Sequence, residues 1–141
     1  MSFVLDASVA LLWLVPQTNP AGVDYADATL NSLKESQALV PSLCALEIAN
    51  VVAKVESKGI VTEADSQRFI TLLGRLNIVT DPATAAHALG DTLNLARRYK
   101  LSTYDAAYLE LALRAGLPLA TLDAGLTKVA AKAGVLIFGT H

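Results

Sequence analysis

Two aspartates stand where an apolar run gives way to a predicted helix. Asp6 follows the run Phe3–Leu5, and Asp123 follows the segment 118–122. If both runs are parallel strands, each carboxylate lies at the carboxyl edge of the sheet, where open α/β sheets bind ligands. Aspartate is also a favoured helix N-cap, because its side chain accepts backbone N–H bonds. Both interpretations remain open for Asp6 and Asp123.

A third acid, Glu47, lies in an otherwise apolar helical segment. The polar residues of this segment share one stripe at helical spacing: Glu47, Asn50, Lys54 and Lys58. Such a stripe points either into a cleft or into solvent, since any amphipathic helix needs a polar side. The pattern makes Glu47 a candidate ligand and Asn50 a weaker one.

The fourth acid, Asp105, stands three residues after Ser102, which is the spacing of a helix capping box with aspartate in place of glutamate. Its helical neighbours at i+3, i+4 and i+7 are mostly apolar, beginning with Tyr108. A lone ionised carboxylate on such a face is costly. A cap and a functional acid therefore explain Asp105 about equally well.

Taken together, the four acids suggest a metal site. Loops at one edge of a parallel sheet would bring them close, and each pair of carboxylates at ~4 Å would repel by roughly 4 kcal/mol at an effective dielectric near 20. A divalent cation relieves that repulsion. Oxygen ligands without histidine or cysteine suit Mg²⁺ or Mn²⁺, and such ions promote phosphodiester hydrolysis by activating water and stabilising the leaving oxygen.

The elements that must position these acids alternate along the chain. Short apolar runs predict strands at 3–5, 38–40, 78–79, 119–120 and 135–138. Segments of helical period predict helices at 7–15, 22–36, 42–58, 62–76, 82–99, 103–115 and 124–133, with a loop at 16–22. Glycines at 59, 116 and 134 follow helical runs and are expected to end them. Continuous apolar strands separated by helices predict an α/β three-layer sandwich, a short parallel sheet flanked by helices.

Composition narrows the classes of protein that remain. With 141 residues, 53% of them hydrophobic and 17% charged, we expect a single domain over 1–141 with its own core. The net charge of −2 argues against nucleic-acid binding through overall positive charge. A lone cysteine, Cys44, fits a reducing compartment. The N-terminal apolar stretch Val9–Val15 is too short to span a bilayer, so we expect a cytoplasmic protein without a membrane segment.

Two other kinds of catalytic site are disfavoured. No glycine pattern of a phosphate-binding loop occurs. The two histidines, His87 and His141, leave a serine or cysteine nucleophile without an obvious base.

Four segments of the chain resemble the PIN-domain ribonucleases, and within them the VapC-type toxins of bacterial and archaeal toxin–antitoxin pairs. In order, these segments are Val4–Ser8, Leu46–Asn50, Tyr104–Leu109 and Ala120–Asp123. Each segment alone is weakly specific, but all four in order within one chain are a strong signal. The resemblance covers nearly the whole length of the chain.

The resemblance implies a metal-dependent endoribonuclease that hydrolyses RNA with a metal-activated water. It implies that the catalytic and metal-binding residues are Asp6, Glu47, Asp105 and Asp123, holding Mg²⁺ or Mn²⁺. Ser8 and Thr121 match small hydroxyl positions beside the family's site, although each is equally well explained as a cap or turn residue. The implied partners are RNA, a second copy of the chain in a homodimer, and a cognate antitoxin lying across the acidic cleft.

One departure concerns RNA contact. Many relatives carry basic residues after the last acid, whereas Ala124 and Gly125 follow Asp123 here. The remaining candidates for phosphate contact are five basic residues, each of which also suits a solvated surface: Lys54, Lys58, Arg97, Arg98 and Lys100. Two alternatives stay open. One is a catalytically silent PIN-like interaction module, and the other is a phosphatase or receiver-like acidic site on another α/β fold.

Overall fold

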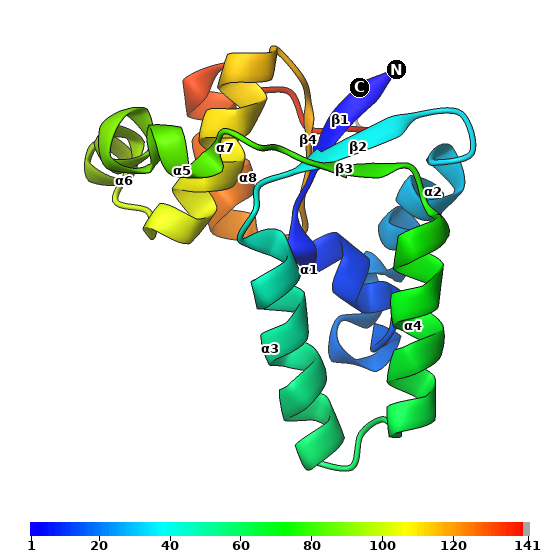
Figure 1. The fold of residues 1–141 in the computed structure, drawn as a ribbon. Coiled ribbons are helices and arrows are strands. Elements are labelled where there is room, and N and C mark those ends of the chain that lie inside the picture. Colours follow the sequence, from blue (N-terminus) through cyan, green and yellow to red (C-terminus); the bar gives the residue numbers. More distant parts are fainter. Residues whose placement is uncertain (140–141) are drawn as a thin grey trace.

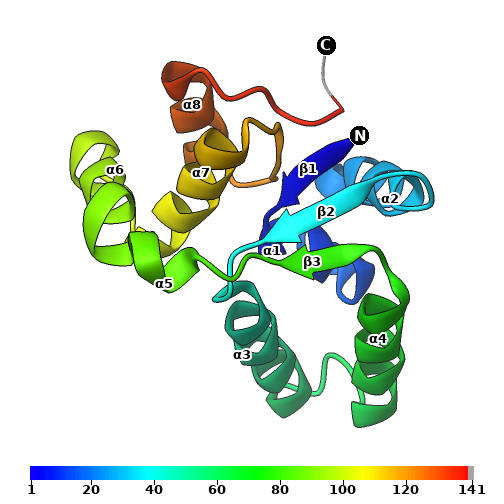
Figure 2. The same ribbon diagram turned by 45° about the horizontal axis from the view of Figure 1, so that its top comes forward.

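The computed structural model describes residues 1–139 and has a parallel sheet at its centre (Figure 1). The four strands are β1 (Ser2–Leu5), β2 (Gln37–Val40), β3 (Ile78–Thr80) and β4 (Leu119–Ala120). Their order is β3-β2-β1-β4, and every neighbouring pair is parallel. Helices cover both faces of this sheet (Figure 2), so the predicted α/β sandwich is confirmed.

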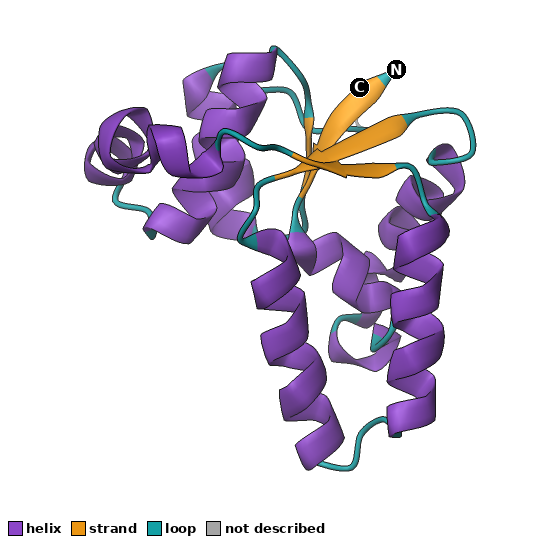
Figure 3. Ribbon diagram, viewed as in Figure 1, coloured by secondary structure: helices purple, strands orange, loops and turns teal. Residues whose placement is uncertain are grey.

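Eight α-helices connect and flank the strands within the described part of the chain (Figure 3). They are α1 (Ala7–Ala10), α2 (Val23–Ser32), α3 (Cys44–Ser57), α4 (Glu63–Arg75), α5 (Thr84–His87), α6 (Leu93–Tyr99), α7 (Thr103–Ala115) and α8 (Ala124–Ala133). Three 3₁₀ turns follow α1, at Leu11–Trp13, Pro16–Thr18 and Pro20–Gly22. The α3–α4 pair projects away from the sheet (Figure 1). None of the helices within residues 1–139 is long and apolar enough to cross a membrane.

Local chemistry explains where several helices begin and end. The Thr62 hydroxyl and the Asp65 carboxylate form a reciprocal capping box at the start of α4. Gly116 and Gly134 follow α7 and α8 with φ of +67° and +81°, a left-handed conformation that a residue without Cβ adopts readily. Gly59 follows α3 in the same way. The predicted helix ends at all three glycines are confirmed.

The expected fifth strand at 135–138 is wrong. Among the described residues, this segment forms only an isolated parallel bridge between Ile137 and Leu119. β4 is two residues long and gives the segment little backbone to pair with. Val135 is buried in the core instead, and the Phe138 ring stacks on Phe3 with centroids 3.9 Å apart.

Three further expectations need correction. The single helix expected at 82–99 is broken at Gly90, whose φ of −111° and ψ of −105° are non-helical, so that α5 and α6 are separate. The loop expected at 16–22 contains the second and third 3₁₀ turns, each with a proline at its first position, where the fixed φ of proline favours a helical start. The helix expected at 22–36 ends at Ser32.

The topology predicts a ligand site between β1 and β4. From β1 the chain adds β2 and then β3 on one side, whereas β4 pairs with β1 on the other side. The strand order therefore reverses between β1 and β4, and open α/β sheets bind ligands at the carboxyl ends of strands flanking such a reversal. Asp6 directly follows β1, and Asp123 stands three residues after β4.

Candidate metal and catalytic site

All four acids singled out from the sequence line one pocket of about 640 Å³. They come from four separate segments: Asp6 after β1, Glu47 in the first turn of α3, Asp105 in the first turn of α7, and Asp123 at the N-cap of α8. Ser8 and Asn50 line the same pocket. The pocket is partly apolar, and its other lining residues are Ala7, Leu11, Leu43, Leu46, Val51 and Tyr104.

Asp6 is the most buried of the four acids, with 5% of its surface exposed. It occupies the N-cap position of α1 but makes no capping hydrogen bond, so the cap interpretation is wrong for this residue. Instead its Oδ2 accepts hydrogen bonds from the hydroxyls of Ser8 at 2.5 Å and Thr121 at 2.8 Å. The two hydroxyls fix the carboxylate where β1 ends.

Ser8 and Thr121 also hold the β4 loop against the end of β1. The Ser8 hydroxyl accepts the backbone N–H of Leu122 at 3.0 Å, and the Thr121 hydroxyl accepts that of Asp123 at 3.1 Å. Each hydroxyl therefore donates to Asp6 and accepts from the loop. Thr121 is not itself among the residues that line the pocket, and it is buried beneath them.

Asp123 combines the two interpretations that the sequence left open. Its Oδ1 caps α8 by accepting the N–H of Leu126 at 2.9 Å, and the residue is exposed at the rim of the pocket. Ser102 similarly caps α7, because its hydroxyl accepts the N–H of Asp105 at 3.1 Å. Asp105 is half-buried and lines the pocket.

Tyr108 is a residue that the sequence argument missed. Its hydroxyl donates a hydrogen bond to Glu47 Oε1 at 2.5 Å, across from α7 to α3. The side chain is 0% exposed. A tyrosine on an apolar helical face is ordinarily a core residue, and the only available signal was its i+3 position relative to Asp105.

The pKa values of three acids reflect their crowding. Burial raises the pKa of Asp6 above its ordinary value, and the Asp123 charge raises it further. Burial likewise raises the pKa of Glu47 and of Asp105, and both carboxyls also feel the charge of Asp6. Neighbouring carboxylates that disfavour each other's ionisation make a pocket that attracts a cation.

The oxygen donors of these acids suit Mg²⁺ or Mn²⁺ better than they suit an ion whose ligands must all come from the protein. Within residues 1–139, no three acidic, histidine or cysteine side chains are arranged to hold one ion directly in this conformation. Mg²⁺ usually binds through one or two carboxylates and keeps several waters. An all-oxygen set that lines a shared pocket suits that mode, and Asp6, Glu47, Asp105 and Asp123 would hold the ion directly or through water.

The basic candidates for RNA contact do not line this pocket. Lys54 is exposed on α3 and Lys58 just after it, and Arg97, Arg98 and Lys100 are exposed on or just after α6. His87 is half-buried and lies 3.7 Å from Asp91, and His141 falls outside the described residues.

Comparison with known proteins identifies the family and the fold. The family model for the PIN domain matches residues 3–132. The chain belongs to the PIN-domain family. A curated PIN-domain relative, Ribonuclease VapC3 of Pyrobaculum aerophilum, is 29% identical over 123 residues, which are 87% of this chain and 90% of the relative.

Solved structures agree with the PIN-domain fold. VapBC2 from Rickettsia felis, bound to a DNA fragment from its promoter, superposes with a TM-score of 0.66 at 17% identity and covers 97% of both chains. FitAcB from Neisseria gonorrhoeae gives a TM-score of 0.60 at 24% identity and covers 99% of this chain and 97% of that one. At these identities the likeness concerns the fold alone.

Proposed function

We propose that this PIN-domain protein is a metal-dependent endoribonuclease, the toxin of a type II toxin–antitoxin pair, acting at the acidic pocket. The observation that carries the proposal is the gathering of four carboxylates, from four separate segments, in one pocket at the strand-order reversal. The identity shared with Ribonuclease VapC3 over most of both chains supports RNA as the substrate.

In this proposal the residues of the site divide into three groups with different tasks. Asp6, Glu47, Asp105 and Asp123 bind Mg²⁺ or Mn²⁺, which when bound supplies an activated water and stabilises charge on the phosphate. Ser8 and Thr121 donate to Asp6 and fix the position of its carboxyl group. Asn50 lines the same pocket, where its amide is placed to bind a substrate oxygen.

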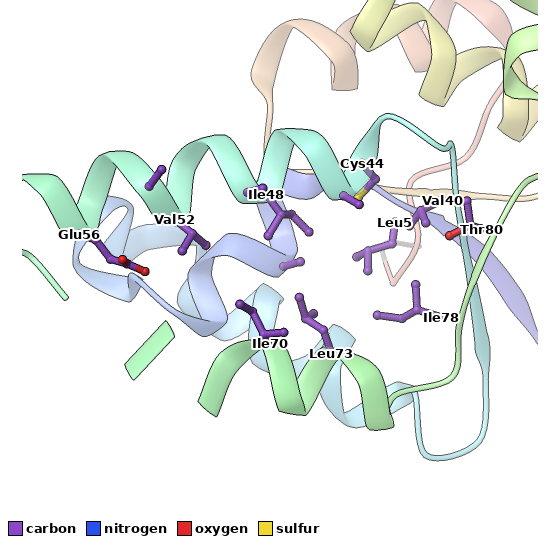
Figure 4. A pocket seen from close by; sticks show the side chains of 14 residues that line it. Leu5, Val40, Cys44, Ile48, Val52, Glu56, Ile70, Leu73, Ile78 and Thr80 are labelled. Carbon is purple, nitrogen blue, oxygen red and sulfur yellow. The ribbon is translucent and has the colours of Figure 1, made fainter. Parts of the chain in front are cut away.

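An apolar groove beside the acidic pocket supports a protein partner. It has a volume of about 470 Å³ and lies between α3 and α4 (Figure 4). Its walls include Ile48, Val52, Ile70 and Leu73. Because α3 contributes to both the groove and the acidic pocket, an antitoxin segment seated on this helix would reach the acids. Apolar grooves that accept an amphipathic segment are a common mode of peptide recognition.

The same family membership supports a homodimer as the resting form and a cytoplasmic site of action. Large apolar side chains that are strongly exposed in the described residues include Leu46 at 74%, Leu89 at 89% and Leu136 at 77%. In the proposed homodimer, a second copy of the chain would cover side chains of this kind.

The test is cleavage of a defined RNA at increasing Mg²⁺ or Mn²⁺ concentration. We expect wild-type protein to cut only with added metal, and Asp6→Asn and Asp105→Asn to lose at least about 100-fold of the rate, because each removes a charged ligand. Asp27→Asn removes an exposed aspartate of α2 that does not line the pocket, and it should cut like wild type. Equal cleavage by wild type and both pocket variants contradicts the proposal.

A catalytically silent PIN-like module is the second candidate. The presence of all four acids in one pocket disfavours it, because Asp6 and Asp105 lie close enough to the other acids for charge repulsion to raise their pKa, a cost that a bound cation offsets. This candidate predicts that metal addition produces no cleavage although the partner still binds.

A further inference from the structure

Tyr108 and Asp105 share one face of α7. They are three residues apart in a helix, and residues at this spacing lie one above the other. Asp105 lines the acidic pocket directly, whereas Tyr108 is buried behind it and reaches across to Glu47 of α3. The same face of α7 therefore places Asp105 in the pocket and, through Tyr108, restrains Glu47.

The Tyr108 hydroxyl is enclosed by protein, with Glu47 and the Cys44 thiol as its polar neighbours. The side chain is 0% exposed, so water does not compete for the hydroxyl. A buried hydroxyl without a hydrogen-bond partner destabilises the fold, and the Tyr108 hydroxyl avoids this by donating to Glu47 Oε1, 2.5 Å away. The Cys44 thiol also interacts with this hydroxyl. The pairing of Tyr108 with Glu47 is thus fixed by the core and not by the pocket.

Glu47 needs such a restraint more than the other acids do. It has the longest side chain of the four, and it stands on α3, which projects away from the sheet (Figure 1). Asp6 is held by two hydroxyls, and Asp123 is held by its bond to the start of α8. The Tyr108 bond gives Glu47 a comparable anchor.

We infer that Tyr108 is a positioning residue of the metal site, whose buried hydroxyl occupies Glu47 Oε1 and thereby presents Oε2 to the cation. This role rests on the proposed function of the pocket. Partners that orient a metal ligand typically change metal affinity 10- to 100-fold when they are removed. Tyr108 contacts neither the cation nor the RNA in this role, and it acts through Glu47.

The experiment measures Mn²⁺ affinity of the protein without RNA, by the electron paramagnetic resonance signal of free Mn²⁺. Tyr108→Phe removes one oxygen and keeps the ring, and we expect it to weaken Mn²⁺ binding at least about tenfold. RNA cleavage by Tyr108→Phe should fall at low Mn²⁺ and rise toward the wild-type rate at saturating Mn²⁺. Tyr99→Phe removes the hydroxyl of a half-buried tyrosine on α6 that does not line the pocket, and it should bind Mn²⁺ like wild type.

A double-mutant cycle separates positioning from a general structural effect. In a Glu47→Ala background, adding Tyr108→Phe should leave Mn²⁺ affinity unchanged, because the hydroxyl acts only through Glu47. Should Tyr108→Phe fail to fold, Glu47→Asp tests the same link, since its shorter side chain keeps the charge but breaks the bond to Tyr108. Glu47→Asp is then expected to show the same loss of affinity.

The outcomes distinguish this inference from the proposed function. Wild-type affinity in Tyr108→Phe, or an equal loss in the Glu47→Ala background, overturns the positioning role while the metal site stands. Wild-type affinity in Glu47→Asp overturns it in the same way. If the wild-type protein itself binds no Mn²⁺, both the inference and the proposed function are overturned.

Discussion

Arg114, near the end of α7, pairs with two buried carboxylates at once. Its Nε and Nη2 donate to Glu110 at 2.8 and 3.0 Å, and its Nη1 and Nη2 donate to Asp81 at 3.3 and 2.5 Å. Asp81 is 7% exposed and Glu110 is 5% exposed, whereas the Arg114 side chain is 29% exposed. The cluster ties α7, which carries Asp105 and Tyr108, to the segment that follows β3.

Removing the guanidinium leaves two buried carboxylates without a cation. Breaking a fully buried ion pair costs roughly 3–5 kcal/mol, and partial exposure of Arg114 places this case near the lower end, at about 3 kcal/mol. Unfolding entropy of ~2.1 cal/mol/K per residue gives about 0.3 kcal/mol/K for 141 residues. Arg114→Met is therefore expected to lower Tm by about 10 °C.

The assay is thermal unfolding followed by circular dichroism at neutral pH. The comparison variant combines Arg114→Met with Asp81→Asn and Glu110→Gln, which removes the buried negative charges as well. This triple variant should recover most of the lost stability, because replacing a whole buried ion cluster is often nearly neutral. A Tm for Arg114→Met within about 2 °C of wild type would refute the reasoning.

Three other predictions concern stability. Hydrogen bonds from Arg114 hold the pKa of Asp81 below its ordinary value. Wild type is therefore expected to have its full excess in free energy of unfolding over Arg114→Met above the unfolded Asp81 pKa of ~3.9. This excess should be lost as the pH falls through the lower folded pKa of Asp81, and urea titrations at several pH values measure it. Burial and the Asp123 charge raise the pKa of Asp6. Asp6→Asn should accordingly raise the Tm of the metal-free protein at pH 7.5, and the gain should shrink as pH falls through the folded pKa of Asp6; a lower Tm for Asp6→Asn at pH 7.5 contradicts this. A Cβ on Gly22 would lie 2.8 Å from Leu122 Cδ1, so Gly22→Ala should lower the free energy of unfolding by about 1–2 kcal/mol in urea, and an unchanged value would show that the neighbours yield freely.

The sequence predicted the fold where local signals and the sheet agreed. Apolar runs such as Phe3–Leu5 became buried strands because both faces of the sheet are covered. The segment 135–138 carries the same apolar signal, yet its short neighbour β4 limits it to one bridge. Strand length depends on the partner as well as on the segment, and periodicity does not reveal the partner.

The acids of the candidate site could be predicted from local sequence, whereas Ser8 and Thr121 were expected beside them only from the family resemblance, and Tyr108 was not expected. Asp6 and Asp123 could be placed because strand ends and helix starts are readable from local sequence. Of the two bonds that fix Asp6, the one from Ser8 is local, but the one from Thr121 joins β1 to the β4 loop, 115 positions away, and no local pattern encodes it. Tyr108 looks like a core residue and is one, and its contact with Glu47 emerges only when α3 and α7 are placed together.

The central claim is that one pocket binds a divalent cation through acids from four segments. The most direct test is the anomalous difference map of a crystal of the protein grown with Mn²⁺. We predict a manganese peak in the pocket, bordered by Asp6, Glu47, Asp105 and Asp123, that is lost in crystals of Asp6→Asn. A map at saturating Mn²⁺ with no peak in this pocket would contradict the claim.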